Sequence, residues 1–198
     1  KIDVLVGTQM IAKGLDFDNV SLVGILDADN ILNFPDFRSH EFAFQLLTQV
    51  SGRSGRKGKQ GDVILQTYNP EQELIKYVKN YDYLNFFKNQ ISERKIFNYP
   101  PFARIISITL KHRNDNQLNF FSDDFVFYLK KSFGNRVLGP EYPIISKIRN
   151  YYLKKILLKI EIGRSLEKAK DIIHFVEENL RNQKRLNGCI VVIDVDPL

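Results

Sequence analysis

Apolar residues in the first 70 positions occur in short runs and, in one segment, at helical intervals. The runs at Val4–Val6, Val20–Asp27 and Gly61–Tyr68 predict three buried strands. Between the second and third runs, Glu41–Val50 carries Phe42, Phe44, Leu46, Leu47 and Val50 at the spacing of a helix. This alternation of strands and helices predicts a parallel α/β sheet.

The pattern changes after Pro70. Apolar and aromatic residues from Leu74 to Ile91 recur at near-helical spacing, and Tyr99-Pro100-Pro101 then forces an extended break. The pattern predicts a linker of two helices. Its aromatic residues fit a packed face better than a set of base-stacking groups, because their period is that of one buried helix side.

Beyond the prolines, the pattern predicts a small α+β domain. The expected order is strand, helix, strand, strand, helix, strand over 103–111, 118–133, 137–140, 151–162, 166–180 and 190–195. This βαββαβ order is the ferredoxin-like split pattern. We therefore expect three parts: an α/β part at 1–70, a helical linker at 71–101 and a carboxyl-terminal domain at 102–198.

Composition and charge narrow the possible functions. With 43% apolar residues the 198-residue chain can bury a core, and Cys189, its single cysteine, excludes an internal disulfide and indicates a buried thiol. No apolar stretch approaches the ~18–20 residues that span a membrane, which predicts a cytoplasmic protein. Residues 71–198 hold 22 basic and 15 acidic residues, a net charge of +7 that is compatible with nucleic acid or an acidic partner and equally with a solvated surface.

One segment has an unusual composition. Gln49–Gly58 contains three arginine or lysine side chains and three of the chain's 11 glycines directly behind the predicted helix. Glycine lets a phosphate approach the backbone, and a guanidinium offers paired donors to phosphate oxygens. Taken alone, the segment fits either a phosphate site or a solvated loop with non-specific nucleic-acid contacts.

Two segments resemble the motifs of superfamily 2 helicases. Gly7–Phe17 is similar to motif V, and Gln49–Arg56 is similar to motif VI. The chain as a whole resembles the PriA family of bacterial replication-restart helicases. Further similar segments are Asp27–Asp29, Pro35–Ser39, Glu93-Arg94, Tyr99–Phe102, Leu138–Pro140 and Asp194–Pro197.

The resemblance implies that residues 1–70 are the later part of a RecA-like second helicase lobe and that the Arg/Gly segment faces ATP. Arg56 would be the arginine finger, Arg53 a second phosphate contact and Gln49 a nucleotide-sensing group, since a finger stabilises charge on the transferred phosphoryl group. The glycines and carboxylate expected on the nucleotide side are Gly14, Asp16, Gly52 and Gly55. The pair Asp27 and Asp29 is not expected to hold a metal, because strand-end aspartates often cap turns and the family's magnesium ligands belong to its other lobe.

DNA contacts are implied at both ends of the chain. Thr8 would face DNA phosphates, and Lys13 is either a phosphate contact or a helix-end cation. In 147–155, cations alternate with aromatics, a composition that single strands and branched DNA favour. The expected contacts there are Lys147, Arg149, Lys154 and Lys155. The family commonly carries arginines at positions 151 and 153, where this chain has Tyr and Leu, so a solvated hairpin stays an alternative.

The sequence contains no Gly-x-x-x-x-Gly-Lys-Ser/Thr phosphate loop and no Asp-Glu box. We therefore expect these residues alone to be unable to hydrolyse ATP, with ATP and Mg²⁺ bound only by a longer protein and zinc bound upstream, not here. The expected partners are forked or single-stranded DNA, SSB and other primosome proteins. The alternatives are a non-catalytic nucleic-acid-binding module with a borrowed half-lobe, and a related translocase with another substrate.

Overall fold

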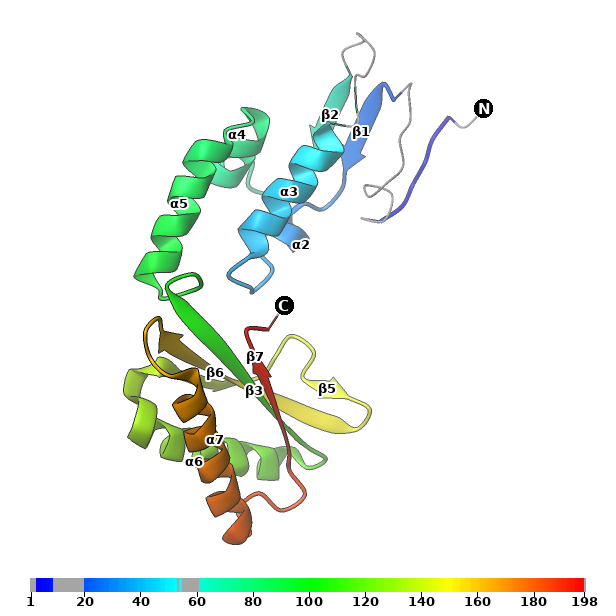
Figure 1. The fold of residues 1–198 in the computed structure, drawn as a ribbon. Coiled ribbons are helices and arrows are strands. Elements are labelled where there is room, and N and C mark those ends of the chain that lie inside the picture. The colour runs from blue at the N-terminus through cyan, green and yellow to red at the C-terminus, as the bar shows by residue number, and fades with distance from the viewer. Residues whose placement is uncertain (1–2, 9–19, 53, 55–60, 198) are drawn as a thin grey trace. The chain divides into compact units, whose positions relative to one another are not determined.

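The computed structural model describes residues 3–8, 20–52, 54 and 61–197. Within these residues the chain divides into two compact units, 1–93 and 94–198 (Figure 1). Their elements are mixed α/β, with a parallel sheet in the first unit and an antiparallel sheet in the second, which confirms the predicted fold class.

The sheet of the first unit has two strands. Strand β1 (Leu22–Ile25) pairs in parallel with β2 (Asp62–Leu65), with Leu22 opposite Asp62 and Ile25 opposite Leu65. The parallel pairing requires a crossover connection, and the helices α2 (Asp29–Leu32) and α3 (Ser39–Ser51) lie on it. The predicted parallel arrangement and the helix at 41–50 are both present.

Two details of the first unit differ from the sequence prediction. No strand is assigned within the described residues 3–8, and Val4 and Val6 are 79% and 84% exposed, so the predicted buried strand there is wrong. Strands β1 and β2 exist but are not buried, because only Ile25 and Leu65 among their residues pack against the unit's core. A strand needs hydrogen-bonded neighbours and covered faces, and apolarity alone supplies neither.

The core of the first unit lies between helices. Ala43, Phe44 and Leu47 recur at helical spacing on α3 and are buried against α4 (Glu73–Lys79) and α5 (Tyr83–Ile96). The rings of Phe44 and Phe86 stack with centroids 4.4 Å apart. The two linker helices are therefore present, and Phe86 packs as expected, whereas Tyr81, Tyr83 and Phe87 are exposed.

The second unit has the ferredoxin-like order that the sequence predicts. Its sheet runs β4-β6-β3-β7, all neighbours being antiparallel, with a short strand β5 also paired to β6. The helices α6 and α7 contact each other and lie together along one side of the sheet (Figure 1). The bounds are β3 Ala103–His112, α6 Asp115–Phe133, β4 Val137–Glu141, β5 Lys147–Ile148, β6 Tyr151–Glu161, α7 Leu166–Asn182 and β7 Ile190–Val195.

Local chemistry fixes the helix starts in this unit. The Asn114 side chain accepts a hydrogen bond from the Gln117 amide at 3.0 Å, and the Ser165 side chain accepts one from the Lys168 amide at 3.2 Å. Each cap satisfies a helix-start donor that has no partner within the helix. Both helices then turn their apolar stripes onto the sheet, where Phe125, Ile108 and Ile156 are fully buried.

Gly139 allows β4 to approach β6. Its φ is +96°, and a Cβ at this position would lie 2.8 Å from the Lys155 carbonyl oxygen. Any side chain would therefore have to push the two strands apart. This close approach explains the glycine in the segment Leu138-Gly139-Pro140.

Candidate functional site

Helix α3 presents the start of the motif VI segment. Gln49 lies on the last turn of this helix with an exposed side chain, and Gly52 follows the helix end, its amide bonded to the Thr48 carbonyl at 3.0 Å. Gly52 has φ −69°, a conformation that any residue adopts. The helix end therefore does not require glycine.

Most of the predicted nucleotide contacts lie outside the described residues. These are Gly14, Asp16, Arg53, Gly55 and Arg56, and the predicted DNA contact Lys13 lies outside them too. Thr8 is described and is exposed. The roles predicted for these residues stay predictions, as do those of Gln49 and Gly52.

The aspartates that follow β1 tie the two strand ends together. Asp29 accepts hydrogen bonds from Thr67 Oγ1 and from the Tyr68 amide, both at 2.9 Å. The Asp27 amide donates to Gln66 Oε1 at 3.3 Å, and the Asp27 carboxylate accepts from the Asn30 amide group. Both aspartates therefore hold the ends of β1 and β2 together through hydrogen bonds.

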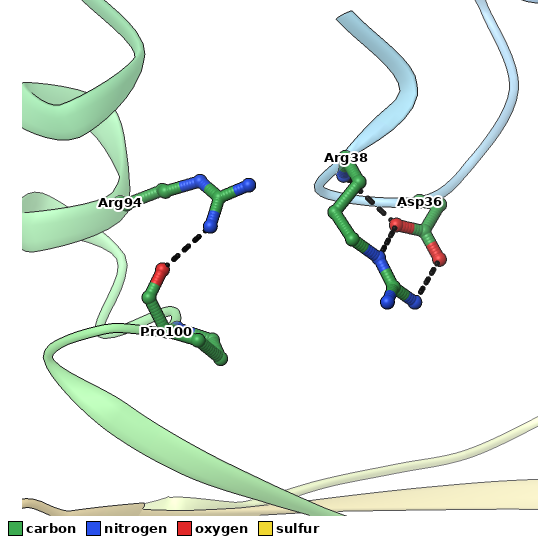
Figure 2. Close-up of polar contacts among 4 residues, drawn as sticks. All are labelled: Asp36, Arg38, Arg94 and Pro100. Atoms are coloured by element: carbon green, nitrogen blue, oxygen red, sulfur yellow. Dashed lines mark hydrogen bonds and ion pairs between the residues drawn. The ribbon is translucent and has the colours of Figure 1, made fainter. Parts of the chain in front are cut away.

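The segment Pro35–Ser39 positions the start of α3 through an ion pair. Asp36 Oδ1 accepts from the Arg38 backbone amide at 2.8 Å and from Arg38 Nε at 3.1 Å, while Oδ2 accepts from Nη2 at 3.3 Å (Figure 2). The guanidinium also lies 4.9 Å from the Phe37 ring centroid and 5.9 Å from that of Phe42. Arg38 is thus a half-buried group that fixes the loop before α3.

A cavity of about 510 Å³ opens beside α3 within the first unit. Its apolar lining consists of Ile31, Phe34, Phe42 and Leu46. Its polar lining consists of Asn30, Ser39, Gln45 and Gln49. Sequence reasoning assigned a role to Gln49 alone among these residues, because the motif resemblance implies no role for the others and only the fold brings residues 30–34 alongside the helix.

The basic segment of the second unit forms a β-hairpin. Lys147 pairs with Tyr152 and Ile148 with Tyr151, across a two-residue turn in which Arg149 and Asn150 have φ of 47° and 66°. Positive φ at both positions matches the right-handed twist of a hairpin but strains Arg149, which is neither Gly nor Asn. The turn holds the Arg149 side chain out in solvent.

The hairpin cations contact aromatic rings. Lys147 Nζ lies 4.4 Å from the centroid of the Tyr152 ring and 3.2 Å from its hydroxyl. Arg113 Cζ lies 5.3 Å from the centroid of the Tyr151 ring. Arg113 was not among the residues that the sequence singled out. The signal for it would have been the register of β3 and β6, which the sequence does not give.

Lys154 and Lys155 point to opposite faces of the sheet. Lys154 shares the side of Ile156 and Leu158, is 8% exposed, and places its Nζ 4.9 Å from the Tyr142 ring centroid. Lys155 is exposed on the other side, opposite Thr109 of β3. The predicted DNA roles of both stay predictions, and the two residues have different surroundings.

Two basic side chains, Arg94 and Lys159, hydrogen-bond to backbone carbonyls of the segment before β3 (Figure 2 shows the contact of Arg94). Arg94 Nη1 donates to the Pro100 carbonyl at 2.8 Å. Lys159 Nζ donates to the Phe97 carbonyl at 2.7 Å and lies 3.6 Å from the Tyr99 ring centroid. Burial lowers the pKa of Lys159. These contacts give a packing role to the Tyr99-Pro100-Pro101 segment.

Other reactive groups have structural surroundings. Cys189 is buried, and burial raises its pKa to about 11, so its thiol is poorly nucleophilic at neutral pH. His112 is buried, with Nδ1 bonded within the turn to Asn114. No group of His, Cys, Asp or Glu in the part of the chain that the structure describes is arranged to hold a metal ion. None of the helices described there is long and apolar enough to cross a bilayer.

The comparison with known families gives two matches. Residues 1–58 match a helicase conserved C-terminal domain, and residues 95–198 match the primosomal protein N C-terminal domain. The second match covers more than half of the chain. The chain belongs to the PriA family. The two matched ranges correspond to the motif V and VI region and to the ferredoxin-like unit.

Curated members of the PriA family align along the chain. The replication restart protein PriA of Bacillus subtilis is 38% identical over 100% of this chain and 24% of its own length. That of Synechocystis is 36% identical over 99% of this chain and 23% of its length, and that of Thermotoga maritima is 34% identical over 100% and 25%. The chain therefore spans about a quarter of the length of these PriA proteins.

The donor groups present fit only part of the cofactor set that the PriA family implies. Gln49 and the glycine after α3 lead directly into a sequence with two arginines, donors that suit the phosphates of ATP. The described residues offer no carboxylate set for Mg²⁺, and the single cysteine offers no zinc site.

Proposed function

We propose that the chain is part of an ATP-dependent 3′→5′ DNA helicase that recognises stalled replication forks and restarts replication by primosome assembly. The observation that carries the proposal is the joint match to a helicase C-terminal domain and to the primosomal C-terminal domain in one chain. The names of the relatives, replication restart protein PriA, support it.

The first unit would supply one wall of the ATP site. In this proposal Arg56 stabilises charge on the γ-phosphate, Arg53 makes a second phosphate contact, and Gln49 senses the nucleotide from the end of α3. ATP and Mg²⁺ would be bound with a lobe that carries the phosphate loop, a motif that these 198 residues lack. Zinc would bind elsewhere in the longer protein, which we place in the cytoplasm.

The second unit would bind DNA and partner proteins. It offers exposed cations at Lys147, Arg149 and Lys155, and Lys147 lies beside the Tyr152 ring. Exposed cations beside aromatic groups suit a DNA backbone next to unpaired bases. We propose fork DNA as the ligand of this surface, with SSB and other primosome proteins as partners of the same unit.

The experiment replaces Arg56 in a longer PriA protein that contains this segment. Arg56→Ala is expected to lower DNA-stimulated ATP turnover by about 10³- to 10⁵-fold, because a finger contributes that much to phosphoryl transfer. Fork-DNA affinity should stay nearly unchanged. ATPase assays and fork binding by fluorescence anisotropy measure the two effects.

Lys57→Ala is the matched control, since it removes a neighbouring positive charge that has no assigned role. If Arg56→Ala turns over ATP as fast as Lys57→Ala, the finger assignment is wrong. If neither the intact protein nor its variants hydrolyse ATP while fork binding persists, the chain belongs to a non-catalytic binding module instead.

A further inference from the structure

The sheet of the second unit has one face that its helices leave open. Helices α6 and α7 lie together along one side of the sheet (Figure 1), and residues at alternate strand positions, such as Ile108 and Ile156, face them. The residues between these positions face the other side, which we call the open face. There Ile190 and Val192 of β7 are 44% and 40% exposed, and Lys155 of β6 is exposed. The second unit's own elements therefore leave this face accessible to a ligand.

Charge in the second unit is divided between its helices and its strands. Helices α6 and α7 carry five basic and seven acidic residues, a net charge of −2. Strands β3–β7 carry six basic and three acidic residues, a net charge of +3. The turns after β3 and β5 add Arg113 and Arg149. The sheet, rather than the helical layer, therefore offers the positive potential that attracts DNA phosphates.

The strand register places cations in the centre of the open face. Lys111 of β3 lies opposite Leu153 of β6, and Lys155 is two residues farther along β6. Such diagonal neighbours are about 7–8 Å apart. Arg113 continues this line beyond the end of β3, with its guanidinium 5.3 Å from the Tyr151 ring centroid. The three cations therefore lie along the two central strands.

The carboxylates of the open face lie at its margins. Asp194 belongs to the edge strand β7, and Glu141 belongs to the edge strand β4. Glu161 and Asp196 each pair with an arginine. Among the described residues, no carboxylate forms an ion pair with either of the two central lysines. Their ammonium groups are therefore available to phosphates.

Apolar side chains lie beside the central cations. Ile190 and Leu153 lie on either side of Lys111, and Val192 lies two residues from Ile190 on the same strand. An interface with another protein normally has few lysines at its centre. A single DNA strand instead presents phosphates to cations and base faces to apolar side chains, and a four-stranded sheet is a platform on which unstacked bases can lie. In a duplex the base faces cover one another, so a duplex would leave the apolar side chains uncovered.

We propose that the open face of the second unit binds a single-stranded segment of DNA. The phosphates contact Arg113, Lys111 and Lys155, and the bases lie over Ile190 and Val192. The proposal rests on the DNA-binding function proposed above and names both the form of DNA and the surface that takes it. It extends the contacts expected at the hairpin onto β3 and β7.

The absence of tryptophan from the chain allows a direct test. Val192→Trp places a single indole on the open face, and the matched control Phe175→Trp places one on α7, at a side chain that is 64% exposed. Oligo(dT) is expected to quench the emission of the first and leave that of the second nearly unchanged, because only the first lies under the bound bases. Equal quenching of both, or none of Val192→Trp, would overturn the proposal. Equal quenching of Val192→Trp by a blunt duplex would overturn the choice of a single strand.

The salt dependence of binding tests the cations. Lys111→Ala should lower the slope of log affinity against log salt by about 0.7, because each phosphate contact on a single strand contributes that much. Lys111→Arg keeps the charge and should keep the slope. The matched control Lys170→Ala removes an exposed cation of α7 and should also leave the slope unchanged. Fluorescence anisotropy with oligo(dT) at several salt concentrations measures the slopes, and equal slopes for Lys111→Ala and Lys170→Ala would contradict the proposal.

The same variants in a longer PriA protein separate the remaining outcomes. If Lys111→Ala lowers the slope in this chain but not in the longer protein, other parts of that protein cover the open face and the proposal is wrong. If Arg149→Ala weakens DNA binding while Val192→Trp is not quenched, DNA meets the hairpin turn, so the open-face site fails and the proposed DNA function stands. If neither this chain nor the longer protein binds DNA, both fail.

Discussion

The two units of this chain differ in how completely their strands are covered. In the second unit, Ile106, Ile108 and Leu110 of the central strand β3 are fully buried beneath two helices. In the first unit, Leu22 of β1 and Ile64 of β2 are 53% and 60% exposed. A sheet that is covered at only a few residues gains less from burial, so the second unit should hold most of the stability.

The unit with the thinner core carries the motif resemblance to an ATPase. Motif VI begins at the end of α3, whose inner face packs on α4 and α5 and whose outer face lines the cavity. The second unit instead offers a rigid sheet on which a hairpin is mounted. The second unit thus has a core of its own, whereas the core of the first unit lies between its helices and leaves much of its sheet exposed. The variants below test this contrast, from the largest expected effect to the smallest.

The largest effect is expected in the core of the second unit. Phe125 of α6 is fully buried, and Phe125→Ala should lower the free energy of unfolding of this unit by about 3–5 kcal/mol. Phe127→Ala, on the same helix but 57% exposed, is the control and should cost far less. Hydrogen exchange by mass spectrometry in urea reports the two units separately. Equal loss of protection in both units would show that they unfold together and would break the contrast.

A smaller loss of stability is expected when the hydrogen bonds of Asp196, near the carboxyl terminus, are removed. Asp196 accepts from Arg104 at 2.7 and 2.9 Å and from the Ile105 amide at 3.2 Å, in a left-handed conformation with φ 51°. Asp196→Ala should cost about 1–2 kcal/mol, because the amide loses its acceptor and alanine disfavours this conformation. Asp196→Asn keeps both features and should cost less. A urea midpoint that is the same for both variants would contradict this account.

The adjacent lysines of β6 test which face of the second unit meets DNA. Lys155→Ala should weaken fork binding and lower the slope of log affinity against log salt by about one unit. Lys154→Ala should mainly reduce stability, by about 0.5–2 kcal/mol, because it removes the buried cation over Tyr142. Binding titrations at several salt concentrations measure the slope. An equal drop in slope for Lys154→Ala would mean that its ammonium group reaches DNA.

The smallest effect concerns pH. Arg136 Nε at 2.8 Å and Arg164 Nε at 3.0 Å hold the pKa of Glu161 below its usual value, the hydrogen bond from Arg136 being the main cause. The unfolded chain therefore binds this proton first as the pH falls, so the stabilisation is present above about pH 4.3 and is lost as the pH drops through the lower, folded pKa. Glu161→Gln should be less stable than the unaltered chain at neutral pH, and the difference should shrink in acid. Urea midpoints across this range measure it, and a constant difference would contradict it.

Much of the fold could be predicted from the sequence. The six elements of the second unit follow from helical and alternating patterns, and their observed bounds differ from the predicted ones by a few residues. The strand expected at Val4–Val6 was wrong because apolarity cannot supply a pairing partner. Strand β5, with two residues, and helix α2, with four, were not predicted, because segments this short carry no detectable periodicity.

The candidate sites divide in the same way. Local sequence determined the motifs, the family resemblance and the chemistry of Gln49 and the arginines that follow it, because donor type and spacing are properties of the chain itself. Only the tertiary structure placed Lys154 and Lys155 on opposite faces of the sheet and the Arg113 guanidinium over the Tyr151 ring. It also brought Phe34 and Phe42 to the lining of one cavity. These outcomes depend on strand register and on packing between residues distant in sequence, and no local pattern contains either.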